Sequence, residues 1–144
     1  MSAKCLQLGV AYGTSEWSTL TRGEYERRVE TDPVTRDVIT RTRSGFAKDG
    51  RVALSRLAAA GDIEGGDGTV TELRIHPDDP LRARASMLQR TELGRGTWRV
   101  SVETEILIHC TRSHFVVEAR LDAWEGRERV FHRSWDERVP RLGV

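Results

Sequence analysis

The stretch that decides the fold is TWRVSVETEILIHC, which runs from Thr97 to Cys110. Its odd and even positions differ in character over nearly the whole length. One set of positions holds Trp98, Val100, Val102, Thr104, Ile106, Ile108 and Cys110, and the other holds Arg99, Ser101, Glu103, Glu105 and His109. Because successive side chains of a strand point to opposite faces of a sheet, this period of two predicts a long, half-buried β-strand.

Neighbouring stretches repeat the pattern and are separated by short turns. Phe115–Glu125 alternates in the same way, and a glycine follows it. Arg129–Val139 comes next and ends at Pro140, which cannot donate a hydrogen bond to a sheet. Leu81–Leu93 precedes the first stretch and is joined to it by a Gly-Arg-Gly loop. Together these segments predict a four-stranded antiparallel meander.

The N-terminal half is less regular. Glu24–Glu30 and Arg36–Thr42 predict a hairpin, because Pro33 between them fixes a backbone angle suited to a turn. Arg51–Leu57 and Thr69–His76 are two further predicted strands.

The stretch between those two strands is rich in small residues. Ala58–Ala60 is compatible with a helical turn, whereas Gly61–Gly68 holds four glycines and predicts a loop. No long helix is expected, and residues 1–20 are assigned either a strand or an arm.

The fold class predicted from these patterns is all-β: an antiparallel, jelly-roll-like β-sandwich with a long-stranded C-terminal meander. A chain of 144 residues is the usual size of one domain. We therefore predict a single β domain over 1–144, best supported over 69–144.

Charge and composition exclude several function classes. The net charge of +1 gives no argument for a nucleic-acid or membrane partner. The chain has no N-terminal apolar leader and no apolar run long enough for a membrane helix. Cys5 and Cys110 form no Cys-x-x-Cys motif, and a disulfide between them is left open. A cytoplasmic protein with reduced thiols is expected.

Catalytic and metal-binding patterns are missing from the sequence. There is no Gly-x-Ser-x-Gly nucleophile motif. His109 and Cys110 are adjacent on a predicted strand, so their side chains are expected on opposite faces. The spacing of the histidines matches no defined metal site. We expect no catalytic residue, metal or cofactor.

Three tryptophans fall on successive predicted strands. Trp98 lies on the apolar side of its strand and is expected in the core, whereas Trp124 lies among polar positions and indicates a second surface. We predict Trp124, Trp135 and His132 as contacts to an interface or a ligand.

The last half of the chain resembles the C-terminal region of cocaine esterase-like hydrolases, relatives of the X-prolyl dipeptidyl peptidases. The residues that carry the resemblance are RIHPDDPL at 74–81, GTWRV at 96–100, LDAWEG at 121–126, VF at 130–131 and RSWDERVPR at 133–141.

The resemblance implies a fold but no catalytic residues. In that family an α/β-hydrolase domain holds the catalytic serine, aspartate and histidine, and a jelly-roll β-sandwich packs on it. This chain looks like part of that sandwich, so no catalytic residue can be carried over. The resemblance is compatible with a detached accessory module, a truncated gene product, or a domain reused for another task.

Three functions remain open at this stage. An accessory or interaction module, with an α/β-hydrolase catalytic domain or a homo-oligomer as partner, predicts an exposed apolar patch around Trp124. A small-molecule-binding barrel or sandwich predicts a cavity near Ala83, Ala85 and Ala119. A hydrolase with an unrecognised site predicts a histidine with a perturbed pKa in a cleft.

Overall fold

The computed structural model describes residues 17–142, which form one antiparallel sheet of nine strands. The strands are β1 Trp17–Thr19, β2 Glu24–Thr31, β3 Val38–Phe46, β4 Ser55–Leu57, β5 Ile63–Ile75, β6 Arg84–Arg95, β7 Trp98–Cys110, β8 His114–Glu125 and β9 Glu128–Pro140. Two single turns of 3-10 helix, η2 Ala58–Ala60 and η3 Pro80–Arg82, complete the regular structure of these residues.

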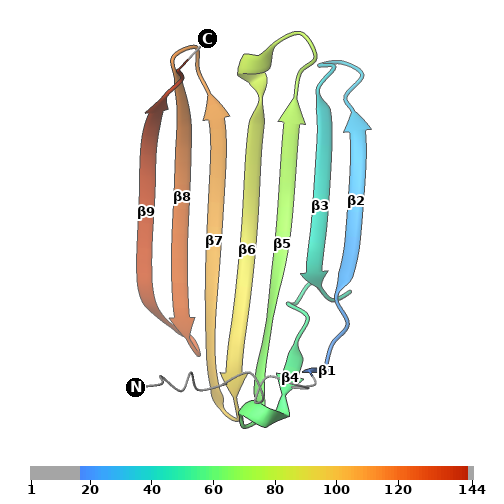
Figure 1. Cartoon of the computed structure of the whole chain (residues 1–144), viewed down its shortest axis with the longest axis vertical. Helices are drawn as coiled ribbons and strands as arrows, with labels where there is room; N and C mark the ends of the chain where they lie inside the picture. Colours follow the sequence, from blue (N-terminus) through green and yellow to red (C-terminus); the bar gives the residue numbers. More distant parts are fainter. Residues whose placement is uncertain (1–16, 143–144) are drawn as a thin grey trace, which may run out of the picture.

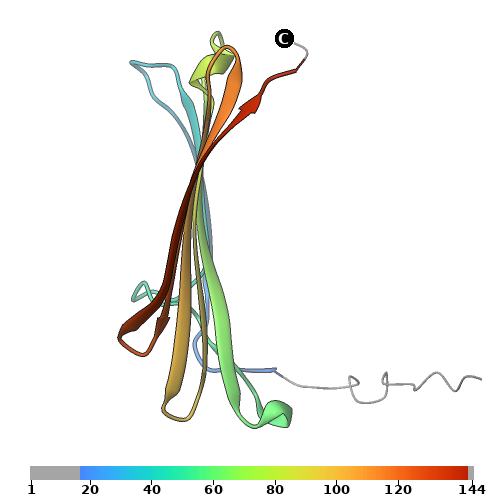
Figure 2. The same ribbon diagram turned by 90° about the vertical axis from the view of Figure 1, so that its left-hand side faces the viewer.

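The sheet is organised around the long strand β5. Its first three residues pair with β4, which pairs with β1, and Thr69–Ile75 pair with β3 of the β2–β3 hairpin. Its other edge pairs with β6, and β6 to β9 follow in chain order. Figure 1 shows the long strands side by side, and Figure 2 shows them edge-on as a single twisted layer.

The all-β class, the antiparallel pairing and the C-terminal meander are confirmed. Strands β6 to β9 match the four predicted segments to within a few residues. Over residues 17–142 the chain supplies one layer of the expected sandwich, since all nine strands belong to one sheet. No long helix forms in this part of the chain, and the expectation for residues 1–16 lies outside the described residues.

The sequence-based prediction of a loop over the glycine-rich stretch Gly61–Gly68 is wrong for most of its length. Gly65, Gly66 and Gly68 lie within β5 rather than in a loop. A Cβ added at Gly66 would lie 2.0 Å from the carbonyl oxygen of Ala53, and one at Gly68 would lie 2.6 Å from the Phe46 ring. These glycines are therefore strand residues without side chains, and they let the segment 46–54 cross closely over the sheet.

Two predicted strands also have different bounds. Only Ser55–Leu57 of the segment Arg51–Leu57 forms a strand, although Val52 makes an isolated bridge with Phe46. The second strand of the first hairpin begins at Val38 because Arg36 still belongs to the turn, with a φ of 63°.

Buried apolar side chains are few, and their location is unexpected. They are Ile39, Phe46, Ala47, Val52 and Val116. Ile39 and Val116 share the face that carries most of the charged residues, and the segment 46–54 packs on that same face over the glycines of β5. Nothing on the opposite face is comparably buried.

Candidate functional site: an uncovered apolar sheet face

The strand register divides the side chains into two faces, because residues paired across strands point to the same side. We call one the apolar face. Over β5 to β9 it carries Leu73, Ile75, Ala85, Met87, Leu93, Trp98, Val100, Val102, Ile106, Ile108, Cys110, Phe115, Val117, Ala119, Leu121, Ala123, Phe131, Trp135 and Val139. The polar residues on the same face are Asp67, Thr69, Thr71, Gln89, Thr91, Arg95, Thr104, Glu125, Arg133 and Glu137. We call the other the charged face, and Arg90, Glu103, Glu105, Glu118, Arg120 and Asp122 are among its residues.

Residues 17–142 leave the apolar face open to solvent. Its large side chains keep substantial exposed fractions: 39% for Ile108, 43% for Phe115, 49% for Phe131 and 51% for Val139. These four residues come from strands β7, β8 and β9, so the exposure extends across the meander. A contiguous apolar surface of this kind marks a site where a protein contacts another surface.

Trp135 occupies a central row of the apolar face. It pairs with Ala119 of β8, which pairs in turn with Ile106 of β7. The Arg133 guanidinium lies 4.9 Å from the centre of the Trp135 ring, so one arginine partly covers the indole. Glu137 lies on the same face, two residues beyond Trp135.

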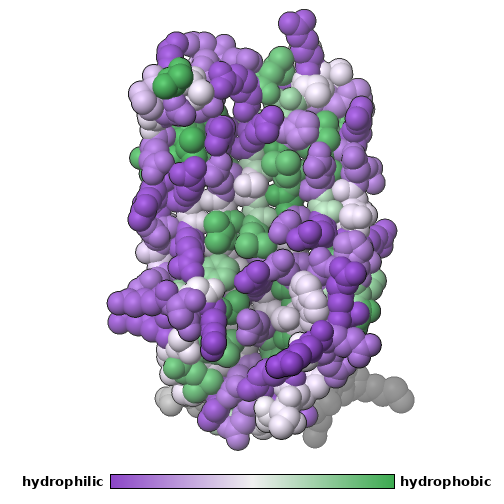
Figure 3. Space-filling view, turned by 180° about the vertical axis from the view of Figure 1, so that it is seen from behind, coloured by the Kyte–Doolittle hydropathy of each residue, from purple (hydrophilic) through white to green (hydrophobic). Residues whose placement is uncertain are grey.

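Ion pairs join neighbouring strands on the charged face, which Figure 3 shows with many hydrophilic residues along it. Arg120 of β8 lies 3.0 Å from Glu105 of β7, and Arg41 of β3 lies 2.8 Å from Glu72 of β5. The hydrogen bond from Arg41 holds the pKa of Glu72 below its ordinary value. The face is thus internally neutralised, and the stems of its long side chains cover apolar neighbours.

Asp122 and His132 form a hydrogen-bonded carboxylate–histidine pair on this face, an arrangement that also occurs in catalytic triads. His132 Nδ1 lies 2.7 Å from Asp122 Oδ1, and the Asp122 carboxylate also accepts a hydrogen bond from Arg129 at 3.2 Å. The bond from His132, with Arg129 beside it, holds the pKa of Asp122 below its ordinary value. Among residues 17–142, no hydroxyl or thiol is hydrogen-bonded to His132, so the pair orients a ring but activates no nucleophile.

A serine–histidine contact exists elsewhere but cannot complete that pair. Ser113 Oγ lies 2.8 Å from His114 Nδ1 in the exposed turn before β8. His114 and Asp122 are eight positions apart on one extended strand, a separation of roughly 26 Å at ~3.3 Å per residue. The pieces of a catalytic triad are therefore present but not assembled.

The three residues predicted as contacts are not brought together. Trp124 and His132 lie on the charged face, and Trp135 lies on the apolar face. Trp124 is half-buried beside Arg90 and Glu103, so the exposed apolar patch expected around it lies instead on the opposite side. His109 and Cys110 point to opposite faces, as expected.

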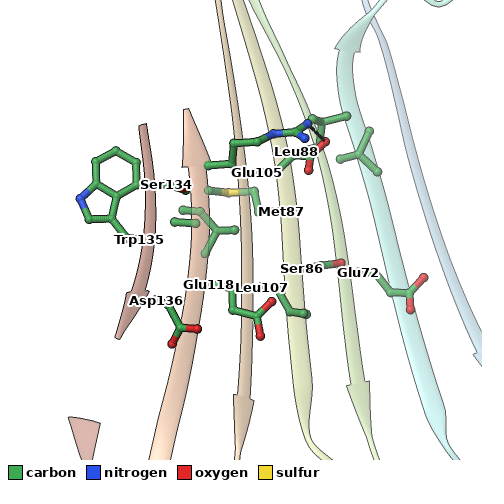
Figure 4. A pocket seen from close by; sticks show the side chains of 14 residues that line it. Glu72, Ser86, Met87, Leu88, Glu105, Leu107, Glu118, Ser134, Trp135 and Asp136 are labelled. Atoms are coloured by element: carbon green, nitrogen blue, oxygen red, sulfur yellow. Dashed lines mark ion pairs between the residues drawn. The ribbon is translucent and has the colours of Figure 1, made fainter. Parts of the chain in front are cut away.

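The charged face is hollowed over its middle strands. A shallow pocket of about 710 Å³ includes Leu88, Leu107 and Val70, with Glu105, Glu118 and Asp136 around them. Figure 4 shows one row of it, in which Asp136, Glu118, Leu107, Ser86 and Glu72 follow one another across the strands. Ala119 lines this pocket together with Met87, Ile106 and Trp135, whose side chains belong to the apolar face, whereas Ala83 and Ala85 are not part of it.

Sequence reasoning missed Phe131, Ile108 and Phe115 as surface residues. Their alternation places them on the apolar side of strands that were predicted to be half-buried. Trp98 was expected in the core, and this expectation is wrong because its side chain is 44% exposed on the apolar face. Period-two patterns report which side of a strand is apolar, but they do not report whether a second layer covers that side.

Residues 17–142 also lack a cluster of metal-ligating side chains and a membrane-spanning helix. No group of three or more potential metal-ligating side chains comes together there. No helix in that range has the length and apolar character needed to cross a membrane. Cys110 is a free thiol in this part of the chain, and its pairing with Cys5 lies outside the described residues.

No protein-family model, no curated protein and no solved structure matches this chain.

Proposed function

We propose that this chain is a non-catalytic interaction module that docks its apolar sheet face onto another folded protein layer. The observation that carries the proposal is the inverted burial of the sheet. The buried apolar side chains lie on the charged face or in the segment above it, while the apolar face stays open.

The energetics of exposure support a docking role. Burial of apolar surface contributes about 25 cal/mol for each Å² removed from water. Soluble monomers rarely leave contiguous apolar patches larger than a few hundred Å². The face spans five strands of 12 or 13 residues, which corresponds to roughly 1,000 Å² at ~4.8 Å between strands and ~3.3 Å per residue. This area includes polar positions such as Thr71, Gln89 and Thr91. Covering it would release a large free energy.

The sheet edges are less suited to docking than the face. The outer strand β9 carries Arg133, Asp136, Glu137 and Arg138, and the outer strand β2 is similarly charged. Charged side chains along an edge strand discourage pairing with another strand. The partner is therefore expected on the face rather than at an edge.

The resemblance to the C-terminal region of cocaine esterase-like hydrolases supports the same role. In that family the corresponding β-sandwich packs on a catalytic domain and contributes no catalytic residue. An α/β-hydrolase domain and a second copy of this chain are the two partners we consider, with the cytoplasm as the proposed location.

A second candidate function is small-molecule binding on the charged face. The pocket of about 710 Å³ there has an apolar floor at Val70, Leu88 and Leu107, and its volume falls within the usual range for ligand sites. Binding at this pocket predicts that Leu107→Arg abolishes a ligand-induced rise in melting temperature, while Ile108→Arg on the other face, outside the pocket lining, preserves it.

The docking proposal is tested by placing a photoreactive amino acid at one face at a time. Ile106 and Glu105 are adjacent on β7 and point to opposite faces, so they form a matched pair of positions. The tagged chain is irradiated in its source cells, and the cross-linked peptides are identified by mass spectrometry.

We expect cross-links from position 106 to one defined surface, either of this chain or of a hydrolase-type domain, and few from position 105. Equal yields from both positions, or scattered products from position 106, would overturn the proposal. Cross-links from position 105 alone would point to the charged face instead.

A further inference from the structure

We propose that the partner of the apolar face is a second copy of this chain, and that two copies close into a two-layer β-sandwich. The inference rests on the proposed docking function and adds the identity and geometry of the partner. The two-fold axis would cross the strands at the row formed by Trp135, Ala119 and Ile106.

The area of the apolar face matches what a stable dimer needs. A standard protein–protein interface buries about 800 Å² on each partner. The face over β5 to β9, polar positions included, offers roughly 1,000 Å² by the strand and residue spacings given above. Two twisted sheets pack face to face with their strands within about 30° of each other, so the sheet can serve as one half of an aligned sandwich.

The rows on either side of the proposed axis are complementary in charge. In an isologous interface a residue above the axis meets a residue below it on the partner, and the reverse contact also forms. On β9 the rows next to Trp135 hold Glu137 on one side and Arg133 on the other. Rotation about the axis therefore places Glu137 of each copy opposite Arg133 of the other.

The same rotation also brings apolar side chains opposite one another. On β8 the axis at Ala119 places Phe115 of one copy opposite Ala123 of the other, and Val117 opposite Leu121. On β9 it places Val139 opposite Phe131. The Phe115–Ala123 pair sets a large side chain against a small one, which favours close packing, and the other two pairs are apolar on both sides. The pattern is thus self-complementary in charge at Glu137 and Arg133 and in apolar character around them.

Other parts of the apolar face fit an interface rim. On the β2 and β3 side this face carries the polar residues Arg27, Thr31, Thr40, Thr42 and Ser44, with Tyr25, Val29 and Val38 among them. A protein interface typically has an apolar centre and a polar, wetter rim. The proposed centre therefore lies over the meander, and the first hairpin lies towards its edge.

The test is a charge swap measured by sedimentation equilibrium. Arg133→Glu places acidic groups opposite each other at two symmetric positions, and Glu137→Arg does the same with basic groups. Like charges facing each other across an interface are strongly unfavourable, so each variant alone should dimerise ~100-fold more weakly than the wild type. An equimolar mixture of the two variants should recover dimers, since opposite charges then face each other at both positions.

Asp136→Arg is the matched control, because Asp136 lies on the charged face of the same strand. It should dimerise like the wild type. Circular dichroism of each variant checks folding, and recovery of dimers in the mixture shows independently that both variants fold.

A wild-type chain that stays monomeric across micromolar concentrations would overturn this inference. So would variants that dimerise like the wild type, or a mixture that does not recover. The proposed function would still stand if cross-links from position 106 led to a hydrolase-type domain, and it would fall if they led to no defined surface.

Discussion

The two faces of this sheet come from the same strands but are built in opposite ways. The charged face holds the buried residues Ile39 and Val116, and it is crossed by the segment 46–54 and by a lattice of ion pairs. The apolar face has larger and more numerous apolar side chains, yet no described element covers it. The difference teaches that, in a single layer, burial follows what lies above a side chain rather than how apolar it is.

The comparison assigns each face a separate role. The charged face supplies the internal packing of one chain, because its long side chains and the segment 46–54 screen apolar neighbours from water. The apolar face contributes stability only when another layer covers it and removes its apolar side chains from water. Substitutions on the charged face should therefore change the free energy of unfolding, and substitutions on the apolar face should change association.

The largest effect is expected where the segment 46–54 crosses the charged face. Gly66→Ala would place a Cβ 2.0 Å from the Ala53 carbonyl oxygen, so backbone must move. We expect a loss of roughly 3 kcal/mol or more in unfolding free energy, measured by urea denaturation. Gly50→Ala is the control. Its φ of 84° is strained for alanine, but no atom lies within 4 Å of the new Cβ, so about 1–2 kcal/mol should be lost. Equal losses would contradict the close crossing.

A pair of phenylalanines tests the division of roles directly. Phe46, the first residue of the segment 46–54, is 3% exposed on the charged face, and Phe131 is 49% exposed on the apolar face. Phe46→Ala should cost about 3–5 kcal/mol of unfolding free energy in dilute protein. Phe131→Ala should cost about 1 kcal/mol or less under the same conditions and should weaken self-association instead. A larger loss of stability at Phe131 than at Phe46 would reverse the assignment of the faces.

Much of this architecture could be predicted from the sequence, because strand periodicity is a local property. The alternation over Thr97–Cys110 predicted β7, and the same logic predicted the other meander strands. Gly61–Gly68 was missed for a physical reason. Glycine content normally indicates a loop, but here the missing side chains make room for a segment that crosses the strand. Only the three-dimensional contact distinguishes the two cases.

The candidate site was less predictable than the fold. Trp124 was singled out because an aromatic residue stood at a polar position, and the structure places it among charged neighbours. The exposed apolar face could not be predicted, because the residues that form it have the pattern of ordinary core residues. Whether such residues are covered depends on how many layers one chain supplies, which is a property of topology rather than of any local pattern.

A smaller effect concerns the pH dependence of the charged face. The pKa of Asp122 is lowered in the fold by its hydrogen bond from His132, with Arg129 beside it. A lowered carboxyl pKa contributes stability above its ordinary value of about 4 and loses it as the pH falls through the folded value. Stability should therefore decline from pH 5 towards pH 2, and the decline should be shallower in Asp122→Asn. An unchanged slope in urea titrations would mean that the pair contributes nothing to acid stability.

The smallest effect compares two arginines that lie over aromatic rings on different faces. The Arg43 guanidinium lies 4.7 Å from the Phe46 ring centre, and that of Arg133 lies 4.9 Å from the Trp135 ring centre. Exposed contacts of this kind contribute about 0.5–1 kcal/mol. Arg43→Gln should lower unfolding free energy by about that amount and leave association unchanged. Arg133→Gln should have a comparable effect on unfolding and should also weaken the dimer several-fold, because it removes a cation that faces Glu137 of the second copy. If both variants weakened association equally, the two faces would not have the separate roles assigned to them here, since the geometry of the two contacts is nearly identical.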